Sequence, residues 1–391
     1  MANNPPSPPQ HPLWRRTPLV ESAILSRSAG CRIFLKLENL QPSSSFKSRG
    51  IGNFVRKAAD AAAVAASQSA APTINGTTTQ SGPEIHFYIS SGGNAGLAAI
   101  SAATTLGYPC TVALPTSASP AILAKLRAAG ASDVLVHGHS WFEADQYLRE
   151  TVMPDAEARS GVKGIYVPPF DHEDVWEGHS TMIGEIEAQM RELGEEDRPN
   201  AIVCSVGGGG LLSGVIQGAQ KAGWVGREAA SNGTKTKIIA TETVGAESLH
   251  KSLEAGKQVT LPGITSIAAS LGAVRVADRA FELASDPSNN VVSAVLTDAE
   301  AAMGCWRFAD DERMLVEPAC GVSVALAYEP DRLRELVGGD LNRESKVVIV
   351  VCGGSRIDLD TLEEYRRKYG KQIEEMRLSG NGDVPSALKG V

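Results

Sequence analysis

Short apolar runs alternate with longer helical patterns along most of the 391 residues, and this alternation constrains the fold more than any other feature. Runs such as 201–205 (AIVCS) and 346–352 (KVVIVVC) are apolar at nearly every position. Strands that are apolar on both faces are typical of parallel sheets with helices on each side. The alternation therefore predicts an α/β protein built on open, twisted, mostly parallel sheets flanked by helices. The other expected strands are 33–38, 85–90, 110–114, 132–136 and 237–241, and the expected helices are 94–106, 119–129, 141–153, 174–193 and 210–222.

Composition and charge narrow the function classes. Hydrophobic residues make up 42% of the chain and charged residues 21%, values that are ordinary for a globular protein with a large core. The formal net charge is −8 and no stripe of Lys and Arg overrides it, so a nucleic-acid partner is not expected. No apolar run approaches the ~18 residues that cross a bilayer, so no membrane partner is expected either.

The start of the chain and the cysteines bear on the compartment. Residues 1–20 contain many prolines, which oppose the amphipathic helix of a mitochondrial presequence. The six cysteines form no CxxC pair, and several lie in apolar runs, a pattern that suits a reducing compartment. These features predict a cytoplasmic protein.

Two segments break the alternation of strands and helices. Residues 59–84 begin alanine-rich and end in small and polar residues, so we expect an extended helix end followed by a surface insertion at about 67–84. Residues 371–391 are charged, then glycine-rich, and carry no strong core signal. We expect a C-terminal tail there.

The first of three turns rich in small residues is 42–50 (PSSSFKSRG), which follows an expected strand and opens a helix. Serine hydroxyls cap helices well, and Lys47 stands at the start of this helix. Burial beside a positive helix terminus would lower the pKa of Lys47, as a Schiff-base lysine requires. A solvated surface lysine is the ordinary alternative, and the local sequence leaves both open.

The second turn is 90–96 (SSGGNAG), directly after the expected strand 85–90. Small residues let backbone amides approach a ligand, and a helix N-terminus favours an anion such as a carboxylate. Asn94 offers both a donor and an acceptor at the same point. An ordinary strand-to-helix turn with an asparagine cap has the same pattern and stays open as the alternative.

The third turn is 205–211 (SVGGGGL), which contains four consecutive glycines. They expose a run of backbone N–H groups at a positive helix end and so predict a phosphate cradle. The turn lacks the Lys-Ser/Thr ending of a P-loop, and its glycine spacing is not that of a dinucleotide fingerprint. A flexible turn is the alternative.

Cys352 closes the last apolar strand and is followed by Gly353, Gly354 and Ser355. Taken alone, it is best interpreted as a buried core residue. However, all four features lie at the carboxyl ends of strands, where open parallel sheets bind their ligands.

Together these segments resemble the serine/threonine dehydratases of the tryptophan-synthase-like class (fold type II) of pyridoxal-phosphate enzymes, and most closely the serine dehydratase branch of animals and fungi. The resemblance runs from about residue 12 to 370. It rests on six motifs in order, SSSFKSRG, SSGGNAG, SVGGGGLLSGV, TETVGAES, VEPACG and VVCGGS. It implies a large domain (1–40 and 173–370) and a small domain (41–172), with the active site between them and a homodimer as the assembly.

The resemblance also implies roles for individual residues. Lys47 would be the Schiff-base lysine of pyridoxal 5′-phosphate and the base at the substrate Cα, Phe46 would pack on the cofactor ring, and Cys352 would face its pyridine nitrogen. Asn94 would face both substrate and cofactor. The substrate carboxylate would bind Ser91, Gly92, Gly93 and Asn94, the cofactor phosphate Gly207, Gly208, Gly209, Gly210 and Leu211, and a monovalent cation, expected to be potassium, Glu242, Ala246, Leu271 and Ala273.

The implied reaction converts L-serine to pyruvate and ammonia, and L-threonine to 2-oxobutanoate and ammonia. A neutral thiol facing the pyridine nitrogen should favour prompt loss of the β-hydroxyl. Serine racemisation or β-replacement is the nearest alternative, and a non-catalytic cofactor- or nucleotide-binding regulator is an alternative of another class. Lys47 at the matched position speaks against the regulator, while the preference between serine and threonine stays open.

Several further residues carry expectations. Gly92 stands where some serine dehydratases have alanine, and loss of that methyl should loosen the pocket. The segment 168–179 is expected to line the site, while Glu317 is open between a structural and a site role. Trp141, Trp224 and Trp306 are expected to be packing residues.

Overall fold

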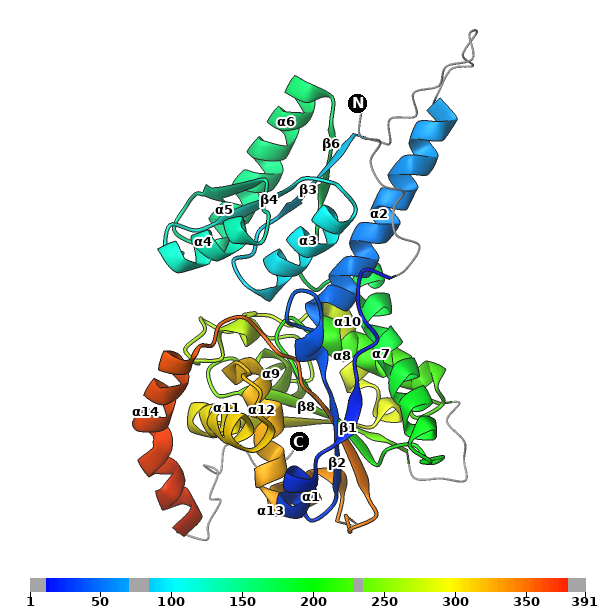
Figure 1. The fold of residues 1–391 in the computed structure, drawn as a ribbon, viewed down its shortest axis with the longest axis vertical. Coiled ribbons are helices and arrows are strands. Elements are labelled where there is room, and N and C mark those ends of the chain that lie inside the picture. Colours follow the sequence, from blue (N-terminus) through cyan, green and yellow to red (C-terminus); the bar gives the residue numbers. More distant parts are fainter. Residues whose placement is uncertain (1–11, 70–83, 228–234, 340, 379–391) are drawn as a thin grey trace. The chain divides into compact units, whose positions relative to one another are not determined.

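The computed structural model describes residues 12–69, 84–227, 235–339 and 341–378, which belong to two compact units (Figure 1). Unit 1 comprises residues 1–15 and 47–178, and unit 2 comprises residues 16–46 and 179–391. The chain passes between them at 15–16, 46–47 and 178–179. The last two crossings lie a few residues after the boundaries expected from the sequence, whereas residues 12–15, expected in the large domain, belong to unit 1. The part of the expected insertion at 70–83 lies outside the described residues.

Unit 1 is built on a four-stranded parallel sheet in the order β5-β4-β3-β6. The expected strands 85–90, 110–114 and 132–136 are confirmed as β3, β4 and β5. They could be predicted because they contain short apolar runs. The fourth strand was not predicted, since its four residues are only partly buried. The strands are β3 (Ile85–Ile89), β4 (Cys110–Leu114), β5 (Asp133–Val136) and β6 (Lys163–Tyr166).

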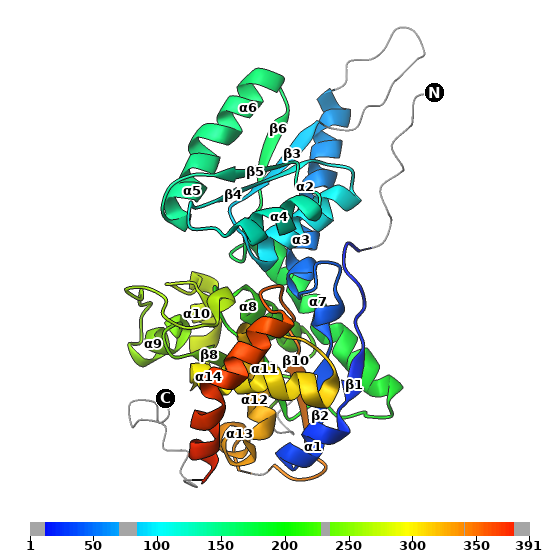
Figure 2. The same cartoon turned by 60° about the vertical axis from the view of Figure 1, so that its left-hand side comes forward.

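Side chains of this sheet alternate between two apolar layers, as the two-residue period of a strand requires. Ile85, Phe87 and Ile89 pack with α2, α3 and α4, whereas Tyr88 faces the opposite layer with Leu148. Figure 2 shows α3 and α4 on one side of the sheet and α5 and α6 on the other. The helices are α2 (Lys47–Ser69), α3 (Asn94–Thr105), α4 (Pro120–Ala128), α5 (Trp141–Tyr147), the π-helical turn η2 (Leu148–Val152) and α6 (Met153–Ser160).

Unit 2 is built on a six-stranded sheet in the order β1-β2-β10-β7-β8-β9, in which only β1 is antiparallel. The predicted strand at 346–352 is confirmed as β10, which lies inside the sheet between β2 and β7. Strands β1 and β9 were not predicted, since the first is three residues long and the second is half-buried along its first three residues. The strands are β1 (Leu19–Glu21), β2 (Arg32–Lys36), β7 (Ala201–Ser205), β8 (Lys237–Thr243), β9 (Val291–Leu296) and β10 (Lys346–Val350).

Helices cover the sheet of unit 2, with α8 and α12 both contacting β7. The longer helices are α7 (Glu173–Glu192, which starts in unit 1), α8 (Gly210–Lys221), α11 (Asp298–Glu312) and α14 (Leu359–Leu378). The shorter ones are α1 (Ala23–Ala29), α9 (Ser248–Glu254), α10 (Asp278–Ser285), α12 (Pro318–Ala325) and α13 (Pro330–Val337), with 3-10 turns η1 (Glu38–Leu40), η3 (Ala269–Leu271), η4 (Pro287–Asn289) and η5 (Leu326–Tyr328).

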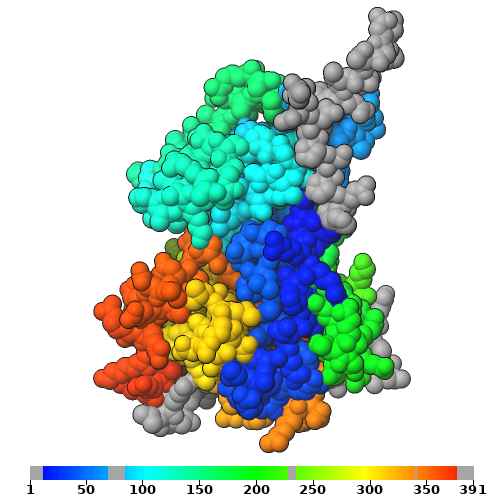
Figure 3. Space-filling model, viewed as in Figure 1, coloured from blue at the N-terminus to red at the C-terminus, as the bar shows by residue number. Residues whose placement is uncertain are grey.

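The expected tail does not begin at residue 371. Helix α14 continues to Leu378 and lies along α11 on the surface of unit 2 (Figure 3). Tyr369 and Ile373 are buried, so this helix contributes to the core that the sequence pattern did not reveal. Among the residues that the structure describes, no helix is both long and apolar enough to cross a bilayer.

Candidate active site

Lys47 is the first residue of α2, and its ammonium group is held in place. The Nζ atom donates to the carbonyl oxygen of Pro169 at 2.7 Å and lies 6.0 Å from the ring centroid of Phe170. The side chain is half-buried, so the solvated surface lysine of the alternative interpretation does not describe it. This contact also brings part of the segment 168–179 to the lysine.

The turn 91–94 joins β3 to α3 in the same unit, with Gly93 at the N-cap and Asn94 as the first helical residue. Asn94 is buried, and the backbone N–H groups of the first turn of α3 lie at the positive end of the helix beside this turn. A Cβ atom on Gly96 would lie 2.0 Å from the carbonyl oxygen of Ser91, so only glycine permits this close approach. The geometry suits a carboxylate.

Gly92 does not leave the open space that was expected from the missing methyl group. A Cβ atom on Gly92 would lie 2.8 Å from Cδ2 of Leu114 and 3.2 Å from Cγ2 of Ile122. The side chains of Leu114 and Ile122 already fill the space that an alanine methyl group would occupy, so the absence of that methyl group does not loosen the packing.

The four-glycine turn precedes α8 in unit 2 and requires glycine for two separate reasons. Gly209 has φ +90°, a left-handed conformation, and a Cβ atom there would lie 2.4 Å from Cβ of Ala280. A Cβ atom on Gly207 would lie 3.0 Å from Cα of Leu271. The turn is therefore a backbone cradle at a helix N-terminus, and it fits the phosphate of the implied cofactor.

The loop that carries Cys352 is joined to the segment before Lys47. Phe46 donates its backbone N–H to the carbonyl oxygen of Cys352 at 3.2 Å, and Ser45 forms an antiparallel bridge with Gly353. The ring of Phe46 lies 5.1 Å from that of His179. Two motifs far apart in the sequence are thus brought together within unit 2.

Cys352 is buried in a small cluster of polar groups rather than in a purely apolar core. Its sulfur lies 3.5 Å from Oγ of Ser205 and is hydrogen-bonded to Cys320. That hydrogen bond from Cys320 lowers the pKa of Cys352, while burial and then the same hydrogen bond raise the pKa of Cys320. All six cysteines of the chain are free thiols.

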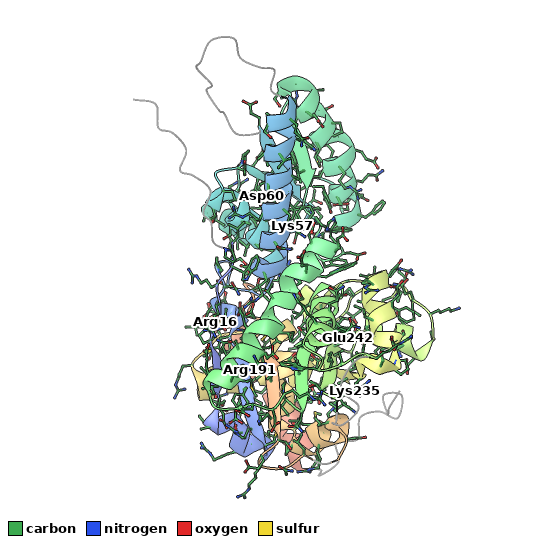
Figure 4. All side chains as sticks on the ribbon, turned by 90° about the vertical axis from the view of Figure 1, so that its right-hand side faces the viewer. Arg16, Lys57, Asp60, Arg191, Lys235 and Glu242 are labelled. Carbon is green, nitrogen blue, oxygen red and sulfur yellow. The ribbon has the colours of Figure 1, made fainter. Side chains whose placement is uncertain are left out.

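Glu242, the predicted side-chain ligand of a cation, is wholly buried in β8, and Figure 4 labels it. Its oxygens accept the backbone N–H groups of Leu249 and His250 at 2.8 Å each, and burial raises its pKa to about 8. Oε2 of Glu247 and Oγ of Ser248 are buried and have no hydrogen-bond partner among the described residues. A bound cation would supply the missing counter-charge, so these residues fit one.

The predicted carbonyl ligands lie on two segments that are tied together. Ala246 is in the turn after β8, whereas Leu271 ends η3 and Ala273 follows it, with the N–H of Ala273 bonded to the carbonyl of Leu271 at 2.7 Å. Thr265 donates to the carbonyl of Gly245 at 3.1 Å and links the segments. Among the described residues, no group of three or more His, Cys, Asp and Glu side chains could hold a metal ion.

Two residues that contact these segments were not assigned to the site from the sequence. Trp141, expected to be a packing residue, is 48% exposed and donates its indole N–H to the carbonyl of Ser90 at 2.7 Å. Glu317 is buried, accepts the N–H of Arg356 at 3.1 Å and packs on Gly354, where a Cβ atom would lie 2.0 Å from its carboxyl carbon. Glu317 therefore supports the loop after Cys352. Trp224 and Trp306 are buried packing residues, as predicted.

Unit 1 therefore holds a half-buried lysine at a helix start and an amide-lined turn, and unit 2 holds a glycine cradle at a helix N-terminus. Residues 11–353 match the family described as "Pyridoxal-phosphate dependent enzyme", and the chain belongs to this family. The family resemblance and the fold class expected from the sequence are both confirmed.

Individual relatives narrow the comparison. "L-serine dehydratase" of Saccharomyces cerevisiae (strain AWRI1631) is 39% identical over 343 residues, which cover 88% of this chain and 94% of the relative. "L-serine dehydratase/L-threonine deaminase" of Bos taurus is 39% identical over 361 residues, covering 92% and 97%. The crystal structure of a fungal L-serine ammonia-lyase from Rhizomucor miehei has a TM-score of 0.76 at 34% identity and covers 91% of this chain and 99% of that one.

Proposed function

We propose that this chain is an L-serine ammonia-lyase that converts L-serine to pyruvate and ammonia, and L-threonine to 2-oxobutanoate and ammonia. The observation that carries the proposal is the amine of Lys47, half-buried at the head of α2 and held by the carbonyl of Pro169. Relatives named as L-serine dehydratases match nearly the full chain, which favours this reaction over racemisation or β-replacement.

Bound pyridoxal phosphate would supply the electron sink that makes the substrate Cα proton acidic. Lys47 would carry the cofactor and then take that proton, because an amine is a base once it is neutral. The carbonyl of Pro169 accepts from Nζ and so sets the direction of the side chain. The amides of 207–211 would bind the phosphate.

The turn Ser91–Asn94 would hold the α-carboxylate of the substrate. Backbone N–H groups at the start of α3 supply positive ends of dipoles to an anion. The amide side chain of Asn94 supplies a further donor, and its acceptor oxygen can meet a cofactor hydroxyl.

Cys352 would face the pyridine nitrogen of the cofactor as a thiol. Cys320 donates to its sulfur, which leaves the Cys352 S–H free to point elsewhere. A thiol is a weaker acid than a carboxylic acid, so it would leave the ring less electron-withdrawing and favour early loss of the β-hydroxyl over a long-lived carbanion.

A monovalent cation, which we expect to be potassium, would bind at Glu242 and at the carbonyls of Ala246, Leu271 and Ala273. The buried, partner-lacking oxygens of Glu247 and Ser248 support a positive charge there. Leu271 abuts Gly207, so an ion held by the 271–273 segment would stiffen the phosphate cradle.

The wider setting follows from the same proposal. Units 1 and 2 would act as the small and large domains, and substrate binding would close one on the other to exclude water. A homodimer in the cytoplasm is the expected assembly and compartment. The six free thiols suit a reducing environment.

The proposal is tested with purified wild type and Lys47→Ala, both incubated with pyridoxal phosphate. The visible absorbance of the lysine-bound cofactor is recorded, and pyruvate formed from L-serine is followed with lactate dehydrogenase. We expect absorbance and pyruvate from the wild type and neither from the variant. Lys57→Ala is the control, because Lys57 lies farther along the same helix (Figure 4). Its side chain forms surface ion pairs with Asp174 and Glu177, so its loss should leave the activity unchanged.

Two other results would redirect the proposal. Cofactor absorbance without pyruvate would indicate racemisation or β-replacement. No absorbance even with excess pyridoxal phosphate would indicate a protein of this fold without the enzyme activity.

A further inference from the structure

Trp141 lies outside the six sequence motifs, yet it touches the backbone next to one of them. Its indole N–H donates to the carbonyl oxygen of Ser90 at 2.7 Å. The side chain is 48% exposed, whereas the packing residue Trp224 is 5% exposed. Because the ring of Trp141 is only half covered by other residues, the hydrogen bond of its indole N–H is a main interaction of this side chain.

The hydrogen bond acts on the peptide plane that opens the turn Ser91–Asn94. The carbonyl of Ser90 and the N–H of Ser91 belong to one planar peptide group, so a donor that holds the first also sets the direction of the second. Ser90 is fully buried, and its hydroxyl donates to the carbonyl of Ala113 at 3.4 Å. The orientation of the Ser91 N–H therefore depends on a side chain remote in sequence.

The start of the helix that carries Trp141 is fixed by local hydrogen bonds. Ser140 accepts the N–H of Glu143 at 3.2 Å as the N-cap of α5, and the carboxylate of Glu143 accepts the N–H of His139 in return. This reciprocal arrangement restrains the first turn of α5.

A second contact ties the same helix to the sheet. Tyr166 on β6 donates its hydroxyl to Asp145 at 2.6 Å, and Tyr166 pairs with Tyr88 on β3, the strand that leads to Ser90. Helix α5 is therefore attached to β3 at two points of unit 1, through Trp141 to Ser90 and through Asp145 to Tyr166, the neighbour of Tyr88. These two attachments fix the position of Trp141 relative to the turn.

We infer that Trp141 is a positioning residue, which orients the Ser90–Ser91 peptide so that the N–H of Ser91 meets the α-carboxylate of the amino-acid substrate. The inference rests on the proposed function and deepens it. It assigns recognition of the carboxylate partly to a side chain that does not itself touch the substrate.

The test uses the holoenzyme of wild type, Trp141→Phe and Trp224→Phe. Trp141→Phe keeps an aromatic ring and removes the N–H, while Trp224→Phe controls for the change of ring. We measure KM and kcat for L-serine, and by calorimetry the Kd of L-alanine, which has the carboxylate but no β-leaving group. Ethylamine, which is L-alanine without the carboxylate, is titrated in parallel.

For Trp141→Phe we expect KM for L-serine and Kd for L-alanine to rise about fivefold, the effect of one neutral hydrogen bond. The kcat, the Kd of ethylamine and the Kd of the cofactor should change less than twofold. Equal weakening of L-alanine and ethylamine, or no weakening of either, would overturn the inference.

Failure of the proposed function gives a different result. A wild type that binds L-alanine but forms no pyruvate from L-serine would refute the lyase reaction, while selective loss of L-alanine binding in Trp141→Phe would still support the inference. A wild type that binds no amino acid would overturn both.

Discussion

The backbone N–H of Phe46 donates to the carbonyl oxygen of Cys352 at 3.2 Å, although the two residues stand near opposite ends of the chain. Gly354 reinforces the junction by donating to the carbonyl of Ser44 at 2.9 Å, and Ser44 adopts the left-handed conformation with φ +61°. These two hydrogen bonds therefore fix the backbone position of Phe46, which precedes the candidate Schiff-base lysine, relative to that of Cys352, the candidate partner of the pyridine nitrogen.

Replacement of Cys352 tests whether its thiol supports the reaction. We expect Cys352→Ala to lower kcat for L-serine about tenfold, because one hydrogen bond to the cofactor ring is worth about 1 kcal/mol or slightly more. Cys110→Ala removes another buried thiol, in β4 of unit 1, and should leave kcat unchanged. Equal kcat values for Cys352→Ala and wild type would contradict the assigned role.

The glycine cradle is tested by adding one methyl group. Gly209→Ala should weaken pyridoxal phosphate binding at least tenfold, because φ is +90° and the new Cβ would lie 2.4 Å from Cβ of Ala280. Gly223→Ala has a similar φ of +70° but no atom within 4 Å of the new Cβ. Titration of the two variants with the cofactor separates backbone strain from damage to the cradle, and equal Kd values would count against a phosphate site at 207–211.

Gly92 is expected to be coupled to the side chain of Leu114. Gly92→Ala should destabilise the protein by about 1–3 kcal/mol, the usual range for overpacking, since the new methyl would lie 2.8 Å from Cδ2 of Leu114. Adding Leu114→Val should recover part of the loss, and the double-mutant cycle in denaturant measures that coupling. Simple additivity of the two substitutions would mean that the space behind Gly92 is not the constraint.

Cation binding is tested by thermal unfolding. Potassium chloride should raise the Tm of the wild type above its value in choline chloride at the same ionic strength, because an ion that binds only the folded state stabilises it. Glu242→Gln should lose this difference. Glu254→Gln, which alters an exposed ion pair with Lys251, should keep it. If potassium still raised the Tm of Glu242→Gln, the ion would bind elsewhere and the proposed site would be wrong.

The buried ring of His86 should make the stability of the protein depend on pH. Burial lowers the pKa of His86 below the ordinary 6.5, and the ring is hydrogen-bonded to Thr111 at 2.8 Å. Below about pH 6.5 the unfolded chain therefore binds a proton that the folded protein does not, so stability falls as the pH drops.

The measurement compares free energies of unfolding at pH 7.5 and 5.5. His86→Asn should show a smaller loss on acidification than the wild type, while His139→Asn, an exposed residue, should show the same loss as the wild type. An identical pH dependence in all three proteins would remove His86 as a cause.

Strand prediction had its clearest signal where a strand is buried on both faces, as β7 and β10 are. The run KVVIVVC indicates an interior strand, because an edge or half-exposed strand would leave some of these apolar side chains in water. Strands β1 and β6 are short and partly exposed, so nothing in their residues distinguishes them from loops. They are strands because neighbouring strands offer them hydrogen bonds.

The α/β fold, the family and the candidate lysine, turns and thiol could all be predicted from the residues alone, because apolar runs and clustered glycines have few physical roles and occur here in a known order. The residues that support them became visible only in the folded chain. The contacts of Trp141 with Ser90, of Glu317 with Gly354 and of Leu114 with Gly92 join residues remote in sequence. A sequence pattern does not predict these partners, because tryptophan, glutamate and leucine serve many different roles in proteins.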